Sequence, residues 1–185
     1  MIVFPEWTVP IEYLPLLSKY AMHRQIAIVF GMEHVVQNDF SFNFCVTILP
    51  YQDDSIKDSV CIFRLKNYYA PLEIEHVEGY GLKVPKPVSY KYDRFNFKGA
   101  YFSLLYCFEL ANITDRSLLK SKVDFVVCSE FNKDINYFSN IIESSVRDLH
   151  CYFVQCNTRQ FGDNRITAPK NSENKDIVKI KGGSS

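Results

Sequence analysis

Three short segments of the chain carry side chains that could act together in one reaction. They are residues 4–6, ending in Glu6, residues 66–71, beginning with Lys66, and residues 106–109, containing Cys107. Each lies at the end of a strand-like segment. A carboxylate can move protons, an ammonium can stabilise an oxyanion, and a thiol can form a thioester. Together these groups are the parts needed to cleave a carbon–nitrogen bond.

Cys107 is a candidate nucleophile because it lies between the apolar residues 101–106 and a more polar stretch that begins at Glu109. A cysteine at a turn from strand to helix can project into a cleft while backbone N–H groups face the same point. Buried cysteines are, however, often only small apolar residues. Taken alone, Cys107 is one candidate among six: Cys45, Cys61, Cys107, Cys128, Cys151 and Cys156.

A thiol nucleophile needs a base, and no histidine of the chain lies in a papain-like or caspase-like context. A buried carboxylate can replace histidine when its pKa moves towards neutrality. Glu6 is suitable because it follows an apolar strand and the rigid Pro5. Lys66 ends a predicted strand beside two tyrosines and could bind an oxyanion. Considered alone, a glutamate or lysine in such a position is more often a solvated surface charge than a catalytic group.

In this order and context, the three residues resemble the nitrilase superfamily of carbon–nitrogen hydrolases. In that family the glutamate follows an apolar strand and a proline, as in residues 3–6. The lysine begins a K-x-x-x-x-P segment, matched by residues 66–71, and the cysteine begins a cysteine–aromatic–acid motif, matched by residues 107–109. The resemblance extends from Met1 to about Pro169. Its further matches are Arg116, residues 154–157, residues 161–163 and Pro169.

This resemblance implies an α/β fold, the four-layer αββα sandwich, truncated here at both ends. It implies one carbon–nitrogen hydrolase-like domain over residues 1–185, part of a longer chain, with a polar tail at 171–185. The implied reaction is hydrolysis of a small-molecule amide or nitrile with no metal or organic cofactor. In it Cys107 attacks, Glu6 moves protons, and Lys66 and the backbone N–H of Phe108 bind the oxyanion. Glu109 completes the cysteine motif as a supporting residue.

Two positions depart from the family pattern. Family members usually carry a second glutamate eight positions after the lysine, but this position is Ile74, between Glu73 and Glu75. Either glutamate could support the lysine, and we favour Glu73 because it is nearer Pro71. The serine often found after the late glycine is replaced by Asp163.

Residues 129–134, residues 147–150 and the Lys-Gly-Gly ending most resemble nitrilase domains fused to bacterial antiphage reverse transcriptases. This narrower resemblance implies antiviral defence and contact with nucleic acid only through the fused domain. A catalytically silent scaffold or assembly domain is therefore the main alternative to an enzyme. Family members commonly associate through helical faces, so we also expect a homo-oligomer.

Composition is consistent with a folded domain. Of the 185 residues, 47% are hydrophobic, and 21 Lys and Arg balance 21 Asp and Glu. A neutral chain argues against a nucleic-acid footprint over the whole surface, and the basic residues between 83 and 98 are usually a solvated face. No apolar run approaches a membrane span. Six cysteines without a C-x-x-C pair indicate thiols in a reducing cytoplasm and no zinc knuckle.

Periodicity predicts alternating strands and helices, which implies helices packed on sheets. Residues 73–92, rich in proline and glycine, are expected to form a long surface loop of the kind that often carries function. The predicted helices are 11–24, 113–122 and 136–149. The predicted strands are 1–4, 25–36, 40–49, 59–65, 95–105, 123–128 and 151–155.

Overall fold

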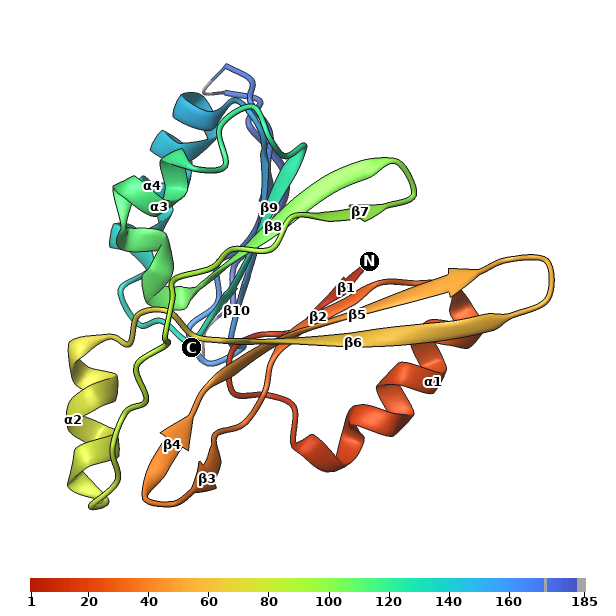
Figure 1. Cartoon of the computed structure of the whole chain (residues 1–185). Helices are drawn as coiled ribbons and strands as arrows, with labels where there is room; N and C mark the ends of the chain where they lie inside the picture. The colour runs from red at the N-terminus through yellow and green to blue at the C-terminus, as the bar shows by residue number, and fades with distance from the viewer. Residues whose placement is uncertain (172, 183–185) are drawn as a thin grey trace. The chain divides into compact units, whose positions relative to one another are not determined.

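The computed structural model describes residues 1–171 and 173–182, which group into two compact units (Figure 1). The first unit is Met1–Tyr90 and the second begins at Lys91. The elements of the first unit are β1 (Ile2–Val3), η1 (Ile11–Tyr13), α1 (Leu14–Arg24), β2 (Ile28–Gly31), β3 (Val35–Gln37), β4 (Phe40–Phe42), β5 (Phe44–Gln52), β6 (Lys57–Leu65) and α2 (Pro71–Gly79).

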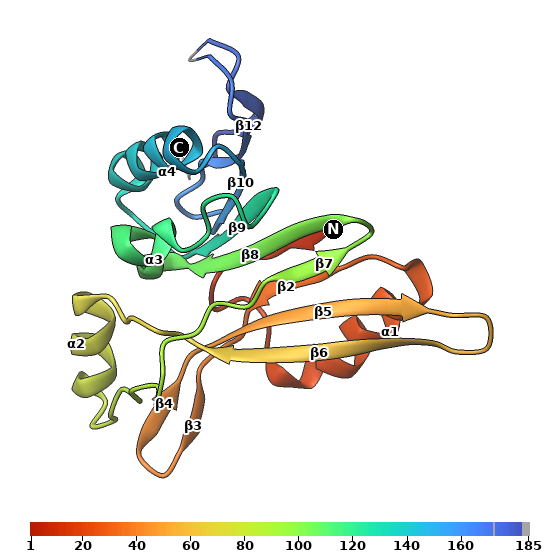
Figure 2. The ribbon, with the colours of Figure 1, turned by 45° about the horizontal axis from the view of Figure 1, so that its top comes forward.

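The first unit is a four-stranded sheet covered on one face by a helix. The strand order is β1-β2-β5-β6, with β1 parallel to β2 and the other pairs antiparallel. Helix α1 packs against β5 and β6, which form a long hairpin (Figure 2). All four residues of β2 are buried, because this strand lies inside the sheet. The predicted helix at 11–24 is therefore confirmed, and the predicted strand 25–36 is divided into β2 and β3.

The prediction of an unbroken loop over residues 73–92 is wrong in its first part, which is helix α2. Pro71 occupies the start of the helix, where a missing N–H costs nothing. The Glu73 carboxylate accepts a hydrogen bond from the backbone N–H of Ala70 at 3.2 Å. Only Glu73 and Val77 of this short helix are buried. Its sequence therefore lacks the apolar period by which helices are predicted.

The second unit is a six-stranded sheet in the order β12-β11-β10-β9-β8-β7. The central strands β8, β9 and β10 are parallel, and antiparallel strands flank them. These elements are β7 (Phe95–Phe97), β8 (Ala100–Tyr106), η2 (Cys107–Ala111), α3 (Ile113–Ser117), β9 (Phe125–Glu130), α4 (Ile135–Leu149), β10 (Tyr152–Asn157), β11 (Asn164–Thr167) and β12 (Asp176–Ile180).

Two further predictions needed correction in this unit. The expected strand at 95–105 is a hairpin, because the chain turns at Lys98 and Gly99, both with positive φ (53° and 84°). Two-residue hairpin turns of matching twist favour such backbone angles. The expected helix at 113–122 ends after α3, and residues 118–122 form turns.

Helices α3 and α4 cover one face of the second sheet (Figure 1). The long helix α4 has one apolar face, which contributes Phe138, Ile142, Val146 and Leu149 to the core. Within residues 1–171 and 173–182, no helix is both long and apolar enough to cross a membrane.

The side chain of Ile142 is fully buried in this core, so Ile142→Ala should remove about 2–5 kcal/mol from the free energy of unfolding. Urea denaturation followed by circular dichroism measures the change. Arg147→Ala, at an exposed position of the same helix, is the control and should stay within about 0.5 kcal/mol of the parent chain. Equal effects from the two variants would contradict the assignment of this helix face to the core.

Candidate active site

Lys66 lies directly after β6 and is fully buried, although lysine is almost never buried without a partner. Its backbone N–H donates to the carbonyl oxygen of Asn43 at 2.9 Å, which fixes the end of the strand. Its Nζ lies 2.7 Å from Glu6 Oε1 and 2.5 Å from Glu73 Oε2. One ammonium therefore binds two carboxylates inside the first unit.

Glu6 is held at the end of the sheet by the strand that precedes it. The N–H of Phe4 donates to the carbonyl of Val29, and the carbonyl of Pro5 accepts from the N–H of Gly31. These bonds align the start of the chain with β2. The Glu6 side chain is 1% exposed, so its carboxylate faces the interior at Lys66. Glu6 and Lys66, which are 60 positions apart in the sequence, are thus brought together as the motif predicts.

Of the two glutamates left open by the sequence, Glu73 is the one that contacts Lys66, whereas Glu75 is exposed. Burial raises the pKa of Glu73, but the neighbouring His34, the charge of Lys66 and the hydrogen bonds from Lys66 and Asn43 together lower this pKa from 4.5 to about 2. Glu73 is therefore ionised across the physiological range. Helix α2 places it there, because Glu73 occupies the first turn of that helix.

Asn43 is a residue of the site that sequence reasoning missed. Its side-chain Nδ2 donates to Glu6 Oε1 at 2.9 Å and to Glu73 Oε1 at 2.7 Å. A neutral amide therefore joins the two carboxylates, and on Glu6 it shares Oε1 with Lys66. The sequence did hold one signal for Asn43, which is a polar residue between Phe42 and Phe44 in an otherwise apolar segment. A polar side chain that is buried needs hydrogen-bond partners, so such a position is a candidate for the site.

His34 and Tyr69 surround the same carboxylates. His34 Nε2 lies 3.6 Å from Glu73 Oε1, and its Nδ1 lies 3.0 Å from the hydroxyl of Ser41. The hydroxyl of Tyr69 accepts a hydrogen bond from the backbone N–H of Asn43 at 3.0 Å. Burial raises the pKa of Tyr69, so its hydroxyl stays protonated. Nothing in the spacing of His34 indicated this position.

Cys107 lies in the second unit at the turn from β8 into η2, as expected of a residue on an elbow. Its φ is 48°, in the left-handed region that is strained for residues other than glycine. The carboxylate of Glu109 accepts a hydrogen bond from the backbone N–H of Tyr106 at 2.8 Å and so closes the turn. Phe108 follows Cys107 in η2. Strained residues of this kind cluster at functional sites.

Three of the other cysteines are poorly suited to nucleophilic chemistry. Burial is the main cause that raises the pKa of Cys151 and of Cys156 to about 12, and it also raises the pKa of Cys128 well above 9.0. The thiolate is the reactive form, so these sulfurs are inert near neutral pH.

The other positions compared with the family pattern make contacts inside the second unit. Arg116 is buried and donates from Nη1 to the carbonyl of Leu110 at the end of the elbow segment. Asp163, where the family often has serine, accepts a hydrogen bond from Ser139 at 2.6 Å and pairs with Arg165. The first interaction joins α3 to η2, and the second joins α4 to the loop before β11 and to β11 itself.

The structure therefore assembles the expected residues in two groups. Glu6, Lys66 and Glu73 contact one another in the first unit, and Cys107 and Glu109 form the elbow of the second. Among the described residues, no group of three or more His, Cys, Asp or Glu side chains could hold a metal ion.

The lowered pKa of Glu73 predicts an effect of pH on stability. A carboxyl group whose folded pKa lies below 4.5 stabilises the fold above that pH and loses this contribution as the pH falls towards 2. Glu73→Gln should therefore be less stable than the parent chain at neutral pH, by on the order of 2 kcal/mol, and the difference should shrink in acid. Urea unfolding at several pH values measures it.

Glu75→Gln is the matched control, because Glu75 lies two positions away on the exposed side of the same helix. A stability difference for Glu73→Gln that is constant with pH, or one that Glu75→Gln reproduces, would contradict the ionic role of Glu73.

Comparison with known proteins gives matches at the level of structure. No protein-family model matches the chain, and no curated protein matches its sequence. An amidase from Nesterenkonia sp. AN1, solved with acrylamide added to its active-site cysteine, is similar with a TM-score of 0.68 and 11% identity. This match covers 99% of this chain and 76% of the amidase.

A carbon–nitrogen hydrolase superfamily protein from Xanthomonas campestris, which carries an arsenic adduct in its active site, gives a TM-score of 0.67 at 11% identity. The match covers 99% of this chain and 74% of that protein. A further structure of the Nesterenkonia amidase, assigned to the nitrilase superfamily, gives 0.65 at 12% identity over 97% of this chain and 72% of the amidase. These likenesses extend over nearly all of the chain, and the chain has the fold of the nitrilase superfamily.

Proposed function

We propose that this protein hydrolyses a carbon–nitrogen bond in a small-molecule amide or nitrile through a thioester on Cys107. The observation that carries the proposal is the buried ammonium of Lys66, 2.7 Å from Glu6 and 2.5 Å from Glu73. Removing such charges from water costs several kcal/mol per ion, and apolar side chains of similar volume are often as stable or more stable. Stability alone therefore gives little reason to keep three charges here.

In the proposed first step, Glu6 takes the proton of the Cys107 thiol, and the sulfur attacks the carbonyl carbon of an amide. Lys66 and the backbone N–H of Phe108 donate to the oxygen on which negative charge develops. Glu6 then returns the proton to the nitrogen, the carbon–nitrogen bond breaks, and an amine or ammonia leaves. The product of this half-reaction is an acyl thioester on Cys107.

In the second step, Glu6 removes a proton from a water molecule, whose oxygen attacks the thioester carbon. The same donors hold the oxyanion, the carbon–sulfur bond breaks, and Glu6 returns the proton to the departing sulfur, so that the carboxylic acid and the free thiol are formed. Glu73 stays ionised in both steps, because its pKa is lowered to about 2. Its charge, with the Asn43 amide, holds Lys66 in position while Glu6 gains and loses a proton.

The proposal requires that Cys107 approach the cluster of Glu6, Lys66 and Glu73. Two observations support this: the order of the motifs along the chain, and the likeness of nearly the whole chain to enzymes with an active-site cysteine. One variant of the Nesterenkonia amidase binds butyramide, and another carries acrylamide or the acetamide moiety of fluoroacetamide covalently on its active-site cysteine. Short aliphatic amides are therefore the first substrates to test.

The alternative is a nitrilase-like scaffold without turnover, within a reverse-transcriptase protein of antiviral defence. Cytoplasmic location, homo-oligomer formation and the fused reverse transcriptase all stay predictions from the sequence. The strained backbone of Cys107 and the buried Lys66 favour the enzyme, because a scaffold needs neither.

Turnover tests the proposal directly. Lys66→Ala and Cys107→Ala should each reduce release of ammonia from butyramide or acrylamide by about a hundredfold or more, because each removes an interaction made in the transition state. Cys61→Ser, at a cysteine outside both groups, should retain activity. Circular dichroism confirms that each variant is folded. Full activity in purified Cys107→Ser would overturn the mechanism.

Thiol labelling tests whether the two groups form one site, even if the substrate is unknown. Cys107 should react with iodoacetamide at neutral pH faster than the other five cysteines, as measured by peptide mass spectrometry. Lys66→Ala should slow this labelling, because the ammonium no longer favours the thiolate. Cys128, Cys151 and Cys156 should stay unlabelled while the chain is folded, because burial raises the pKa of each. Equal labelling of Cys107 and Cys61 would favour the scaffold.

A further inference from the structure

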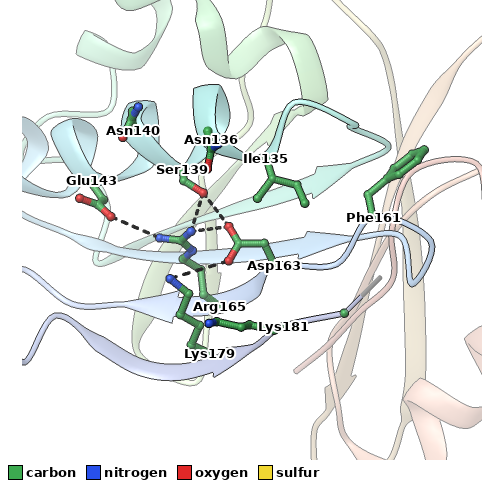
Figure 3. Close-up of a pocket in the computed structure, with 11 residues that line it drawn as sticks. Ile135, Asn136, Ser139, Asn140, Glu143, Phe161, Asp163, Arg165, Lys179 and Lys181 are labelled. Carbon is green, nitrogen blue, oxygen red and sulfur yellow. Dashed lines mark hydrogen bonds and ion pairs between the residues drawn. The ribbon is translucent and has the colours of Figure 1, made fainter. Parts of the chain in front are cut away.

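A cavity of about 470 Å³ lies in the second unit beside the first turns of α4 (Figure 3). Small-molecule sites usually span roughly 300–1,000 Å³. Its lining comes from α4, from residues 161–165 and from residues 179–182. None of the lining residues belongs to β8 or η2, the elements that carry Cys107, so this cavity is separate from the thiol elbow.

Two backbone segments meet beside the cavity, at Gly162 and Gly182. Gly162 has a φ of 78°, and a Cβ atom at this position would overlap the backbone of Gly182. Only glycine permits this approach. The close packing brings the segment after β12 over the loop before β11, and places Lys181 along the cavity wall.

The charges that line the cavity leave an excess of positive charge. Asp163 is paired with Arg165, and Glu143 is bound by Lys175 Nζ at 2.6 Å. Lys179 lies at the outer limit of ion pairing, 4.0 Å from Asp163 Oδ1 and 3.8 Å from Asp176 Oδ2. Lys181 makes no ion pair with any residue in the described part of the chain. The two lysines are therefore available to a ligand.

The lining also has unused hydrogen-bonding capacity. Arg165 is 3% exposed, and its Nε lacks a hydrogen-bond partner among the described residues. Figure 3 shows its guanidinium group at the centre of the site, with Ser139 and Glu143 reaching it from α4. Asn136 and Asn140, on successive turns of α4, also line the cavity. Within residues 1–171 and 173–182, no hydrogen bond occupies their side-chain amides.

We propose that this cavity binds a small oxyanion, an organic carboxylate or a phosphate, through Lys179 and Lys181. The amides of Asn136 and Asn140 would donate to further polar atoms of the ligand. A cation is disfavoured, because each lining carboxylate already has a basic partner. The site does not depend on the chemistry proposed for Cys107.

Isothermal titration calorimetry of the whole chain in low-salt buffer tests the proposal with two probes, inorganic phosphate and citrate. We expect one of them to bind one to one with a dissociation constant of about 1 mM or lower. The double variant Lys179→Gln/Lys181→Gln should weaken this binding about tenfold or more, because charge-assisted hydrogen bonds are lost.

Lys120→Gln/Lys122→Gln is the matched control: it removes the same charge from exposed positions of the same unit and should leave the affinity unchanged. Asn140→Asp adds a carboxylate to the lining of the cavity and should also weaken binding of an anion. Because these positions lie on the surface, the variants are expected to fold. Absence of binding by both probes, or equal weakening in the two double variants, would overturn the proposal. The stronger probe shows whether phosphate or carboxylate oxygens are preferred.

Discussion

The first unit depends on one electrostatic requirement: the ammonium of Lys66 is fully buried and must be neutralised by protein groups. Glu6 from the start of the chain and Glu73 from helix α2 meet it at 2.7 and 2.5 Å. Each carboxylate comes from a different element, so the charge joins the strand end, the loop after β6 and the short helix. Loss of Lys66 would leave two buried carboxylates without their cation, which is strongly destabilising.

The Asn43 amide offsets the repulsion between the two carboxylates that surround Lys66. Two carboxylates around one ammonium leave a net negative charge, and like charges in close proximity repel each other. The Asn43 amide donates to both at 2.9 and 2.7 Å without adding charge. His34 also lies near Glu73, with Nε2 3.6 Å from Oε1, and the His34 side chain is partly exposed to solvent. The site is thus an ionic centre surrounded by neutral or weakly basic donors.

The sequence predicted the parts of the fold in which local pattern and tertiary position agree. Helix α4 has an amphipathic period, and the strands around Val127 and Phe153 are apolar runs, so both were found. Helix α2 was missed because its only buried polar group, Glu73, interacts with Lys66 and gives no apolar period. The hairpin at Gly99 was missed because a single glycine was read as part of a strand, although glycine favours the positive φ found there.

The candidate site also contains residues that local sequence pattern predicted and residues that it did not. Glu6, Lys66 and Cys107 could be found because each occupies a motif with a fixed sequence context. Glu73 was ambiguous by one position, and only the start of the helix decides which of the two carboxylates turns inward. Asn43 and His34 act through contacts between residues 30 or more positions from Glu73 in the sequence, and no local pattern encodes such contacts.

The elbow of Cys107 is shaped by its own neighbours, chiefly by the Glu109 carboxylate on the N–H of Tyr106. Glu6, Lys66 and Glu73 are likewise fixed by contacts within the first unit. The Cys107 elbow and the Glu6–Lys66–Glu73 cluster are therefore each held in place by contacts within their own unit. The proposed reaction needs both of them. A substitution that relaxes the elbow would therefore leave the ion pairs of the first unit in place, and loss of one of those ion pairs would leave the hydrogen bond that closes the elbow in place.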